Sequence, residues 1–229
     1  MRGHFFLFVA LVVISGCAHN VREAASSSCL GGLSQETRQA VVVTPKAAPS
    51  AKDVTVRLFE KTEKGWKQAG ASMDGVAGRN GLAPPGEKLE GDGRTPSGVF
   101  PLERGFGYEF LETKLPYIVL TPDMIWIDDP KSPLYNTLVS RSEGEGVSHE
   151  IMRRSDHLYR YGAVVEYNTK TIVPGAGSAI FFHIWRDPDT ATAGCVATAE
   201  ADMVRMLQWL DPAKRPEAVI RIAGCEALP

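Results

Sequence analysis

Apolar residues alternate with polar ones, or form short runs, along most of the chain, and this pattern predicts a domain built mainly from β-strands. Turn-forming residues separate the patterned stretches, which have the length of strands. The expected strands are 40–43, 54–60, 66–69, 72–77, 117–121, 162–167, 179–184 and 218–222. Glycine and proline are too frequent in residues 78–98 for regular structure to continue there. We therefore expect a mostly β (α+β) fold with a few helices.

One helix is predicted shortly after Cys195. Thr198 can cap its N-terminus, and Asp211-Pro212 ends it. The apolar residues that fall at helical spacing in between are Ala199, Met203, Met206, Leu207 and Leu210. Cys195 should then lie at the entrance to this helix.

One of the predicted strands carries a histidine, His183. Because side chains alternate across a strand, His183 shares one face with Phe181 and Trp185, while Phe182 and Ile184 point to the other face. A histidine at the end of such an apolar strand is held in place by packing on both sides.

The N-terminal residues have the pattern of an export signal. Residues 1–4 carry one positive charge, and the apolar run at 5–14 is too short to span a bilayer comfortably. Ile14-Ser15-Gly16-Cys17 resembles a bacterial lipobox, in which the cysteine is acylated and becomes the first residue. The alternative is an ordinary signal peptide cleaved nearby, with Cys17 incidental. The expected organisation is a lipoprotein signal peptide at 1–16, a flexible tether at 17–38 and a folded domain at 39–229.

Charge and hydropathy limit the partners of the protein. The formal net charge is −2 and no stretch gathers lysine and arginine into a stripe, so nucleic acid is not expected as a partner. No second apolar run approaches membrane-spanning length, which leaves a lipid on Cys17 as the expected membrane attachment. We expect a monomeric lipoprotein of the cell envelope that faces the periplasm. Ala18 after the cysteine indicates the outer membrane, if the host has one.

The cysteine count predicts one disulfide and one free thiol. If Cys17 carries lipid, three thiols remain in a compartment that permits disulfides, and an odd number suggests that one stays free. Cys29 lies near the start of the mature chain and Cys225 near its end, and the two ends of a compact domain are often close. We therefore predict a Cys29–Cys225 disulfide and a free Cys195. Three free thiols are the alternative.

Cys195 and His183 together predict an acyl-transfer site. A helix N-terminus and a nearby imidazolium both lower a thiol pKa, and His183 can take the thiol proton and return it to a leaving amine. Gly194 has no Cβ, so a substrate carbonyl can approach the backbone, where the amides of Gly194 and Cys195 would stabilise an oxyanion. Taken singly, each residue also has a structural interpretation. Cys195 would be a small buried thiol, and His183 a histidine whose hydrogen bonds are satisfied within the fold. The spacings of His183, Asp187, Asp189 and Cys195 match no metal-ligand pattern, so neither a metal nor a cofactor is expected.

Two separate segments resemble a known family, the L,D-transpeptidases of YkuD type. The first runs from Gly78-Arg79-Asn80-Gly81 to Thr95-Pro96-Ser97-Gly98-Val99-Phe100, and the second joins Ser178–His183 to Thr192-Ala193-Gly194-Cys195. The resemblance implies a β-rich catalytic domain acting on peptidoglycan stem peptides. Its cysteine would attack the amide after the diamino acid, form a thioester and pass the acyl group to an amine. By the same resemblance Cys195 is the nucleophile, His183 the base and Gly194 part of the oxyanion site, and a backbone carbonyl, here that of Ile184, orients the imidazole.

The same segments depart from the common pattern of that family. Most members read His-Gly at the base and Ser-His-Gly-Cys at the nucleophile, often with arginine two residues later. This chain has Ile184 after the histidine, Ala193 before the Gly-Cys pair and Ala197 after it. The resemblance is therefore to a divergent branch, and substrate preference does not carry over.

Four residues near these motifs are predicted to contact substrate. They are Trp185, Arg186, Thr192 and Arg79. Arg186 can pair with a stem carboxylate, although Trp185 and Arg186 read equally well as a rim aromatic and a solvated charge. Arg79 lies in a segment that also reads as a turn.

Three functions stay open at this point. The first is an L,D-transpeptidase, and the second is a hydrolase on the same scaffold, such as an L,D-carboxypeptidase or an amidase that releases attached groups. The third is a non-catalytic envelope-binding module. Because a pure binding module needs neither Cys195 nor His183, their presence favours an enzyme.

Overall fold

The structure is a computed structural model of the chain and describes residues 30–222. Cys17, Cys29 and Cys225 lie outside the described residues, and so do the predicted lipidation and the predicted disulfide. Within the described range, Cys195 is a free cysteine. No helix of this range is long and apolar enough to cross a membrane.

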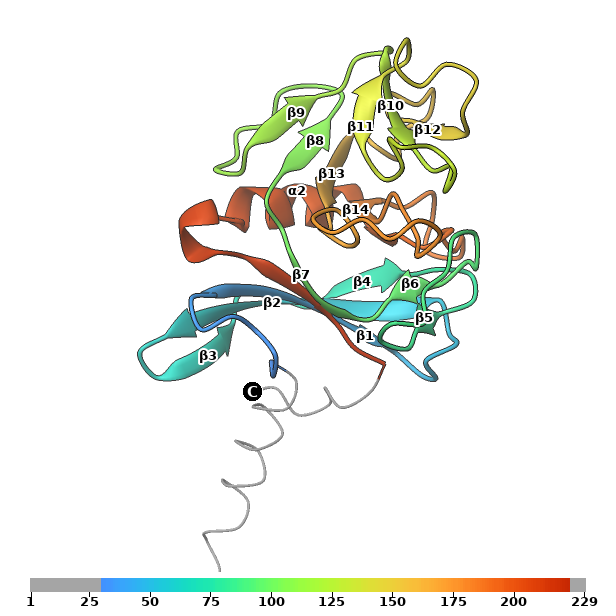
Figure 1. The fold of residues 1–229 in the computed structure, drawn as a ribbon. Coiled ribbons are helices and arrows are strands. Elements are labelled where there is room, and N and C mark those ends of the chain that lie inside the picture. The colour runs from blue at the N-terminus through green and yellow to red at the C-terminus, as the bar shows by residue number, and fades with distance from the viewer. Residues whose placement is uncertain (1–29, 223–229) are drawn as a thin grey trace, which may run out of the picture.

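A large mixed sheet of eleven strands organises the domain. Its strands are β1 (Gln39–Pro45), β2 (Asp53–Thr62), β3 (Gly65–Gln68), β4 (Met73–Val76), β7 (Gly98–Pro101), β8 (Gly105–Gly107), β9 (Tyr117–Val119), β13 (Tyr161–Val164), β14 (Phe181–Ile184), β15 (Val196–Thr198) and β16 (Glu217–Ile220). The strand order is β7-β16-β1-β2-β4-β15-β14-β13-β8-β9, and β3 pairs with β2. The sheet curls around the helix α2 (Glu200–Trp209), so that β1, β2 and β7 lie on one side of the helix and β8, β9 and β13 on the other (Figure 1).

Two small sheets complete the described strands. β10 (Met124–Ile127), β11 (Leu138–Ser140) and β12 (His149–Ile151) form an antiparallel sheet in the order β11-β10-β12, near β8 and β9 in Figure 1. β5 (Leu82–Ala83) and β6 (Thr95–Pro96) form a parallel pair. A short 3-10 helix, η1 (Pro212–Lys214), precedes β16.

The core lies on both faces of the large sheet. In β1, Val41 and Val43 pack in one buried cluster with Met203 of α2, whereas Ala40 and Val42 belong to a second cluster. β1 is flanked by β2 and β16 and covered on both faces, which explains why its sequence is a continuous apolar run without alternation.

The predicted mostly β fold class is confirmed. A strand lies at each of the eight predicted positions, although β4, β9, β13 and β14 are each two residues shorter than expected. The sequence pattern did not predict β5, β6, β7, β8, β10, β11, β12 and β15. These strands have only two to four residues each, too few to establish a period of two.

The predicted helix is present, but it begins later than expected. Residues Val196–Thr198 form β15, which pairs in parallel with β14 and antiparallel with β4, so α2 begins only at Glu200. Its N-cap is Ala199, without a side-chain cap, so the predicted Thr198 cap is wrong. Cys195 therefore precedes a buried strand and does not lie at a helix N-terminus.

Residues 30–38, the described part of the predicted tether, pack against the sheet. Leu30 is buried in a cluster with Val42 and Phe59. Thr37 is fully buried, and its hydroxyl donates to the carboxylate of Glu217 at 2.6 Å. The packed part of the chain thus begins by Leu30, before the predicted boundary after residue 38.

Candidate active site

β14 and β15 bring the predicted base and nucleophile together. The two strands run parallel with His183 opposite Ala197, and Cys195 directly precedes β15. Because side chains alternate, Cys195 and Ala197 share a face, and His183 lies on that same face. The amide of Phe181 donates to Cys195 Sγ at 3.4 Å, and the thiol donates to the carbonyl of Ala179 at 3.2 Å. Cys195 and His183 line one pocket of about 370 Å³.

The imidazole of His183 is held in one tautomer. Its Nδ1 lies 2.8 Å from the carbonyl oxygen of Ile184, which can only accept, so Nδ1 carries the proton and Nε2 is left free. This is the carbonyl that the sequence analysis expected. Burial lowers the pKa of His183 to about 4, against the opposing effect of the Ile184 hydrogen bond. The imidazole is therefore neutral near pH 7 and able to accept a proton.

Cys195 is protonated in the resting site. Burial, and after it the charge of Glu150, raise the pKa of its thiol to about 12. The amide of Phe181 and the charge of Lys88 lower this pKa only in part. The expectation that a helix N-terminus and an imidazolium lower the thiol pKa is wrong, because β15 separates Cys195 from α2 and His183 is neutral.

Two threonine hydroxyls fix the backbone of the nucleophile. Thr192 Oγ1 donates to the carbonyl of Cys195 at 2.7 Å, and Thr95 Oγ1 donates to the same carbonyl at 3.2 Å. Thr95 also accepts from the amide of Gly78 at 2.9 Å, so it joins the first family-like segment to the second. Thr95 was not among the predicted site residues, although its place in the Thr-Pro motif of the first family-like segment was the available signal.

Gly194 packs closely against neighbouring chain. A Cβ at this position would lie 3.1 Å from the carbonyl oxygen of Arg94 and 3.3 Å from a methyl of Ile180, both tight contacts. The amide of Gly194 donates to Thr192 Oγ1 at 3.1 Å. The geometry thus gives this glycine a packing role, and its amide must leave Thr192 before it can stabilise an oxyanion; that role stays a prediction.

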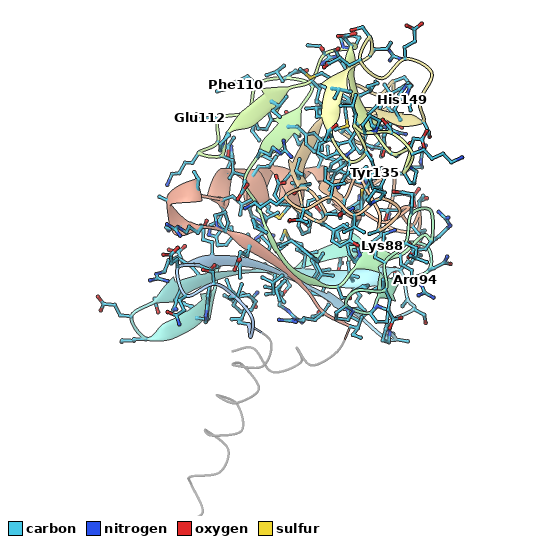
Figure 2. The ribbon with its side chains drawn as sticks, in the orientation of Figure 1. Lys88, Arg94, Phe110, Glu112, Tyr135 and His149 are labelled. Carbon is cyan, nitrogen blue, oxygen red and sulfur yellow. The ribbon has the colours of Figure 1, made fainter. Side chains whose placement is uncertain are left out.

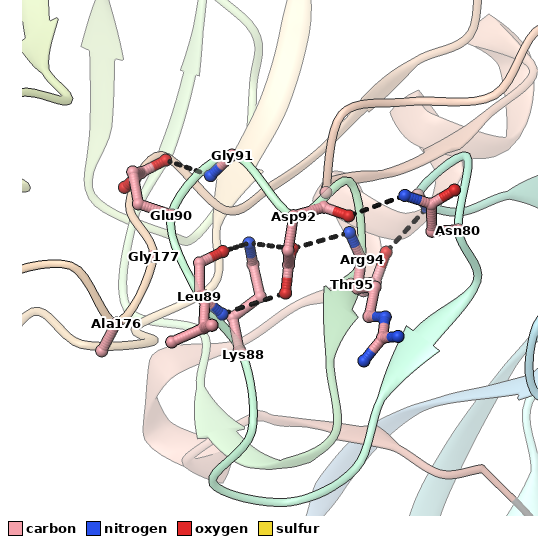
Figure 3. Close-up of polar contacts among 12 residues, drawn as sticks. Asn80, Lys88, Leu89, Glu90, Gly91, Asp92, Arg94, Thr95, Ala176 and Gly177 are labelled. Atoms are coloured by element: carbon pink, nitrogen blue, oxygen red, sulfur yellow. Dashed lines mark hydrogen bonds and ion pairs between the residues drawn. The ribbon is translucent and has the colours of Figure 1, made fainter.

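Lys88, Glu90 and Gly91 of the loop at 88–95 line the pocket, and Figure 3 shows polar contacts that hold this loop. Lys88 is buried, and its Nζ donates to Asp92 at 2.7 Å and to the carbonyl of Leu89 at 2.6 Å. Asp92 also accepts from the amides of Leu89 and Arg94 at 2.9 and 2.8 Å. Asn80 donates to the carbonyl of Asp92 at 2.8 Å. In Figure 2, Lys88 and Arg94 lie on the same side of the view as Tyr135 and His149, away from Phe110 and Glu112.

The pocket holds charged and aromatic residues that sequence reasoning did not assign to it. They are Lys88, Glu90, Asp128, Glu150, Arg154 and Tyr159. Tyr159 is buried, and its ring lies edge-on to that of His183 at 5.2 Å between centroids. Asp128, Glu150 and Arg154 lie far from both motifs in sequence, so no local pattern could have placed them here, whereas Lys88 and Glu90 lie within the first family-like segment.

All four predicted substrate contacts line the same pocket. These are Trp185, Arg186, Thr192 and Arg79. Trp185 is half-buried, whereas the Arg186 side chain is 57% exposed and lies 3.6 Å from Asp156. Thr192 is committed to the loop contacts described above, and Arg79 donates to the carbonyl of Gly91 at 3.4 Å. Their contact with substrate stays a prediction.

Comparison with known families supplies the identity of the domain. Residues 65–220 match the YkuD family, described as the L,D-transpeptidase catalytic domain, and this match covers more than half of the chain. The chain belongs to this family. The described fold and pocket therefore belong to a domain of the L,D-transpeptidase catalytic type.

Other comparisons add little to the YkuD assignment. No curated protein matches the chain. A crystal structure of the helical cell shape determining protein Pgp2 from Campylobacter jejuni is similar at 14% identity, with a TM-score of 0.39. The similarity covers 87% of this chain and 55% of the Pgp2 chain, so the chain spans about half of that protein's length.

The departures from the common YkuD pattern have a structural counterpart. Ala197, at the position where arginine is common, is buried opposite His183. Cations reach the pocket from other elements instead: Lys88 from the 88–95 loop, and Arg154 from the segment between β12 and β13.

Proposed function

We propose that the protein is an L,D-transpeptidase that cleaves the amide after the diamino acid of a peptidoglycan stem and transfers the acyl group to an amine. The observation that carries the proposal is a buried thiol and a neutral, tautomerically fixed imidazole on one face of β14 and β15, lining one pocket. The membership of the YkuD family supports the same substrate class.

The acylation step follows from the protonation of the two groups. Nε2 of His183 takes the thiol proton as Sγ of Cys195 attacks the carbonyl carbon of the substrate. The tetrahedral intermediate collapses by breaking the carbon–nitrogen bond, and His183 returns the proton to the departing amine. The product of this half-reaction is a Cys195 thioester and a neutral His183.

The deacylation step repeats the chemistry with a new nucleophile. An acceptor amine attacks the thioester and loses its proton through His183 to the departing thiolate. The products are a new amide and the resting thiol. Water in place of the amine gives a carboxylic acid, so the acceptor alone separates transfer from hydrolysis.

The test is intact-mass analysis of the full chain incubated with purified stem-peptide fragments, and separately with a carbapenem. Wild type should gain acyl adducts that Cys195→Ala lacks, and the fragments should gain a joined stem. Thr55→Val, on β2 away from the pocket, is the matched folding control. Adducts with products that gained only water would replace transfer by hydrolysis. No adduct and unchanged fragments would leave a binding module.

We also propose that the protein is anchored in the cell envelope through a lipid on Cys17 and faces the periplasm. The support is the lipobox-like Ile14-Ser15-Gly16-Cys17 after a short apolar run. Metabolic labelling with a fatty acid in the native host should mark wild type and not Cys17→Ser. Equal labelling of the two proteins would contradict the proposal.

A further inference from the structure

Glu150 brings a carboxyl into the pocket that contains Cys195. It is the middle residue of β12, where it pairs with Trp126 of β10. Trp126 is fully buried, and its ring centroid lies 5.0 Å from that of Phe181 on β14. The small sheet is thereby fixed to the strand that carries His183, so the Glu150 carboxyl is a built part of the pocket wall.

Neighbouring side chains of the described part of the chain form hydrogen bonds with only one carboxylate oxygen of Glu150. Oε1 accepts from the hydroxyl of Tyr159 at 2.7 Å and lies 3.4 Å from Nη1 of Arg154. Arg154 makes its shorter bonds, 3.0 and 2.9 Å, to both oxygens of Asp156. Within residues 30–222 no hydrogen bond reaches Glu150 Oε2. The carboxyl is therefore anchored, while its charge is compensated only weakly.

Two more carboxyls, those of Asp128 and Glu90, line the same pocket and act on Glu150. Glu90 accepts from the hydroxyls of Tyr135 and Ser178, which are neutral donors. Asp128 Oδ1 is buried and has no hydrogen-bond partner in the described part of the chain. The pKa of Glu150 is raised overall, first by burial and then by the charges of Asp128 and Glu90. The Tyr159 hydrogen bond and the Arg154 charge lower this pKa only in part.

The less exposed cations of the pocket are already neutralised. Lys88 is paired with Asp92 at 2.7 Å and its side chain is 4% exposed, and Arg154 is bound by both oxygens of Asp156. The other two cations, Arg79 and Arg186, are exposed, where solvent screens their charge. The uncompensated charge nearest the reacting groups is consequently negative.

We propose that Glu150 binds an ammonium group of the substrate and thereby couples substrate binding to the reactivity of Cys195. The inference rests on the proposed function, because the diamino acid before the cleaved amide carries a second amino group of this kind. The charge of Glu150 disfavours the Cys195 thiolate in the empty pocket. An ammonium bound at Oε2 offsets that charge, so proton transfer to His183 becomes easier when the substrate is in place.

The test uses small thiol reagents that differ only in charge, so it needs no peptidoglycan. The full chain is treated with 2-aminoethyl or 2-hydroxyethyl methanethiosulfonate, from which the Cys195 thiolate displaces methanesulfinate to form a mixed disulfide. The rate at Cys195 is read from the mass of the peptide that contains it. For each protein, the rate with the cationic reagent is divided by the rate with the neutral reagent. This ratio is then divided by the ratio of the same two rates measured for the free thiol 2-mercaptoethanol.

Wild type should favour the cationic reagent about tenfold, which corresponds to about 1.4 kcal/mol. Glu150→Gln keeps the shape of the side chain and its bond from Tyr159, and should bring the ratio to about one. Glu145→Gln removes the same charge from an exposed position before the same strand and should leave the ratio at its wild-type value. A wild-type ratio in Glu150→Gln would overturn the proposal.

Two further measurements keep the result interpretable. If Glu150→Gln does not fold, raising the salt from 0.01 to 1 M should lower the wild-type ratio several-fold. A wild-type ratio of one at low salt would also overturn the proposal. The reagents act on the thiol whether or not the protein transfers acyl groups. A protein that modifies no peptidoglycan yet favours the cationic reagent refutes the proposed function and supports the charge assigned to Glu150.

Discussion

At the scale of single residues, burial decides the protonation of the site. Cys195 and His183 are 7% and 6% exposed, and burial disfavours the thiolate of one and the imidazolium of the other. The resting pair is therefore a thiol and a neutral imidazole. The hydrogen bond to the Ile184 carbonyl leaves Nε2 as the accepting nitrogen. Proton transfer then has to accompany attack on the substrate.

The pH dependence of alkylation should report the raised thiol pKa. With a pKa of about 12, the rate at which iodoacetamide alkylates Cys195 should rise about tenfold per pH unit from pH 7 to 10. The measurement is the mass-resolved rate at Cys195, compared with the same peptide in the unfolded protein. A plateau between pH 6 and 8 would indicate a preformed thiolate–imidazolium pair instead.

His183 should make the protein less stable in acid. Its pKa is about 4 in the folded protein and about 6.5 in the unfolded chain, so the unfolded state binds more protons between these values. The free energy of unfolding therefore falls as the pH falls from about 6.5 to 4, by about 2 kcal/mol between pH 7 and 5 from this residue alone.

Urea unfolding at pH 7 and 5 tests this assignment. His183→Gln should lose about 2 kcal/mol less than wild type between the two pH values. His157→Gln, at an exposed histidine, should behave as wild type. Equal losses in wild type and His183→Gln would contradict the lowered pKa.

At the scale of the elements, the segments around β6 and β15 hold each other in place. Thr95 of β6 is fully buried and bonds to the backbone of both Gly78 and Cys195. Gly194 permits close contact with the carbonyl of Arg94. The nucleophile is thus positioned by a segment about one hundred residues away in sequence, which explains why both family-like motifs belong to one site.

Thr95→Val should destabilise the protein by about 1–3 kcal/mol, because the Gly78 amide loses its acceptor and the Cys195 carbonyl loses one of two donors. Thr55→Val, on the half-buried face of β2, is the matched control and should change stability little. Chemical denaturation measures both. A Thr95→Val protein as stable as the control would show that these two hydrogen bonds do not hold the segment.

At the scale of the whole molecule, Asn136 ties the small sheet to the site. Its Oδ1 accepts from Nε1 of Trp126 at 2.8 Å and from the amide of Ala179 at 3.0 Å. Its Nδ2 donates to the carbonyls of Tyr167 and Asn168 at 3.1 and 2.7 Å. The carbonyl of Ala179 in turn accepts the Cys195 thiol. Asn136 has a φ of 58°, a left-handed conformation that asparagine tolerates better than most residues.

Asn136→Asp should destabilise the protein by about 2–5 kcal/mol. The replacement has the same shape, but it turns two donors toward carbonyls into acceptors and buries a charge. Gln35→Glu makes the same chemical change at an exposed position and should cost little. Thermal and urea unfolding of the two variants measure the difference. Equal stability would show that the four contacts of Asn136 are dispensable.

The sequence by itself determined the fold class, the positions of the longer strands, and the pairing of a histidine on an apolar strand with a cysteine after Gly194. These features are local, since a period of two or an unbroken apolar run is visible within a few residues. The Ile184 carbonyl was expected from the resemblance to the YkuD family, and the structure places it against the imidazole of His183.

Tertiary structure alone decided the chemical state of the site. The later start of α2 depends on β15 pairing with β14 and β4, and the high thiol pKa depends on burial; neither is encoded in the neighbours of Cys195. Glu150 reaches the pocket only because the small sheet packs on β14 through Trp126. A side-chain pattern records which face of an element is buried, whereas charge and desolvation depend on every element that meets at the pocket.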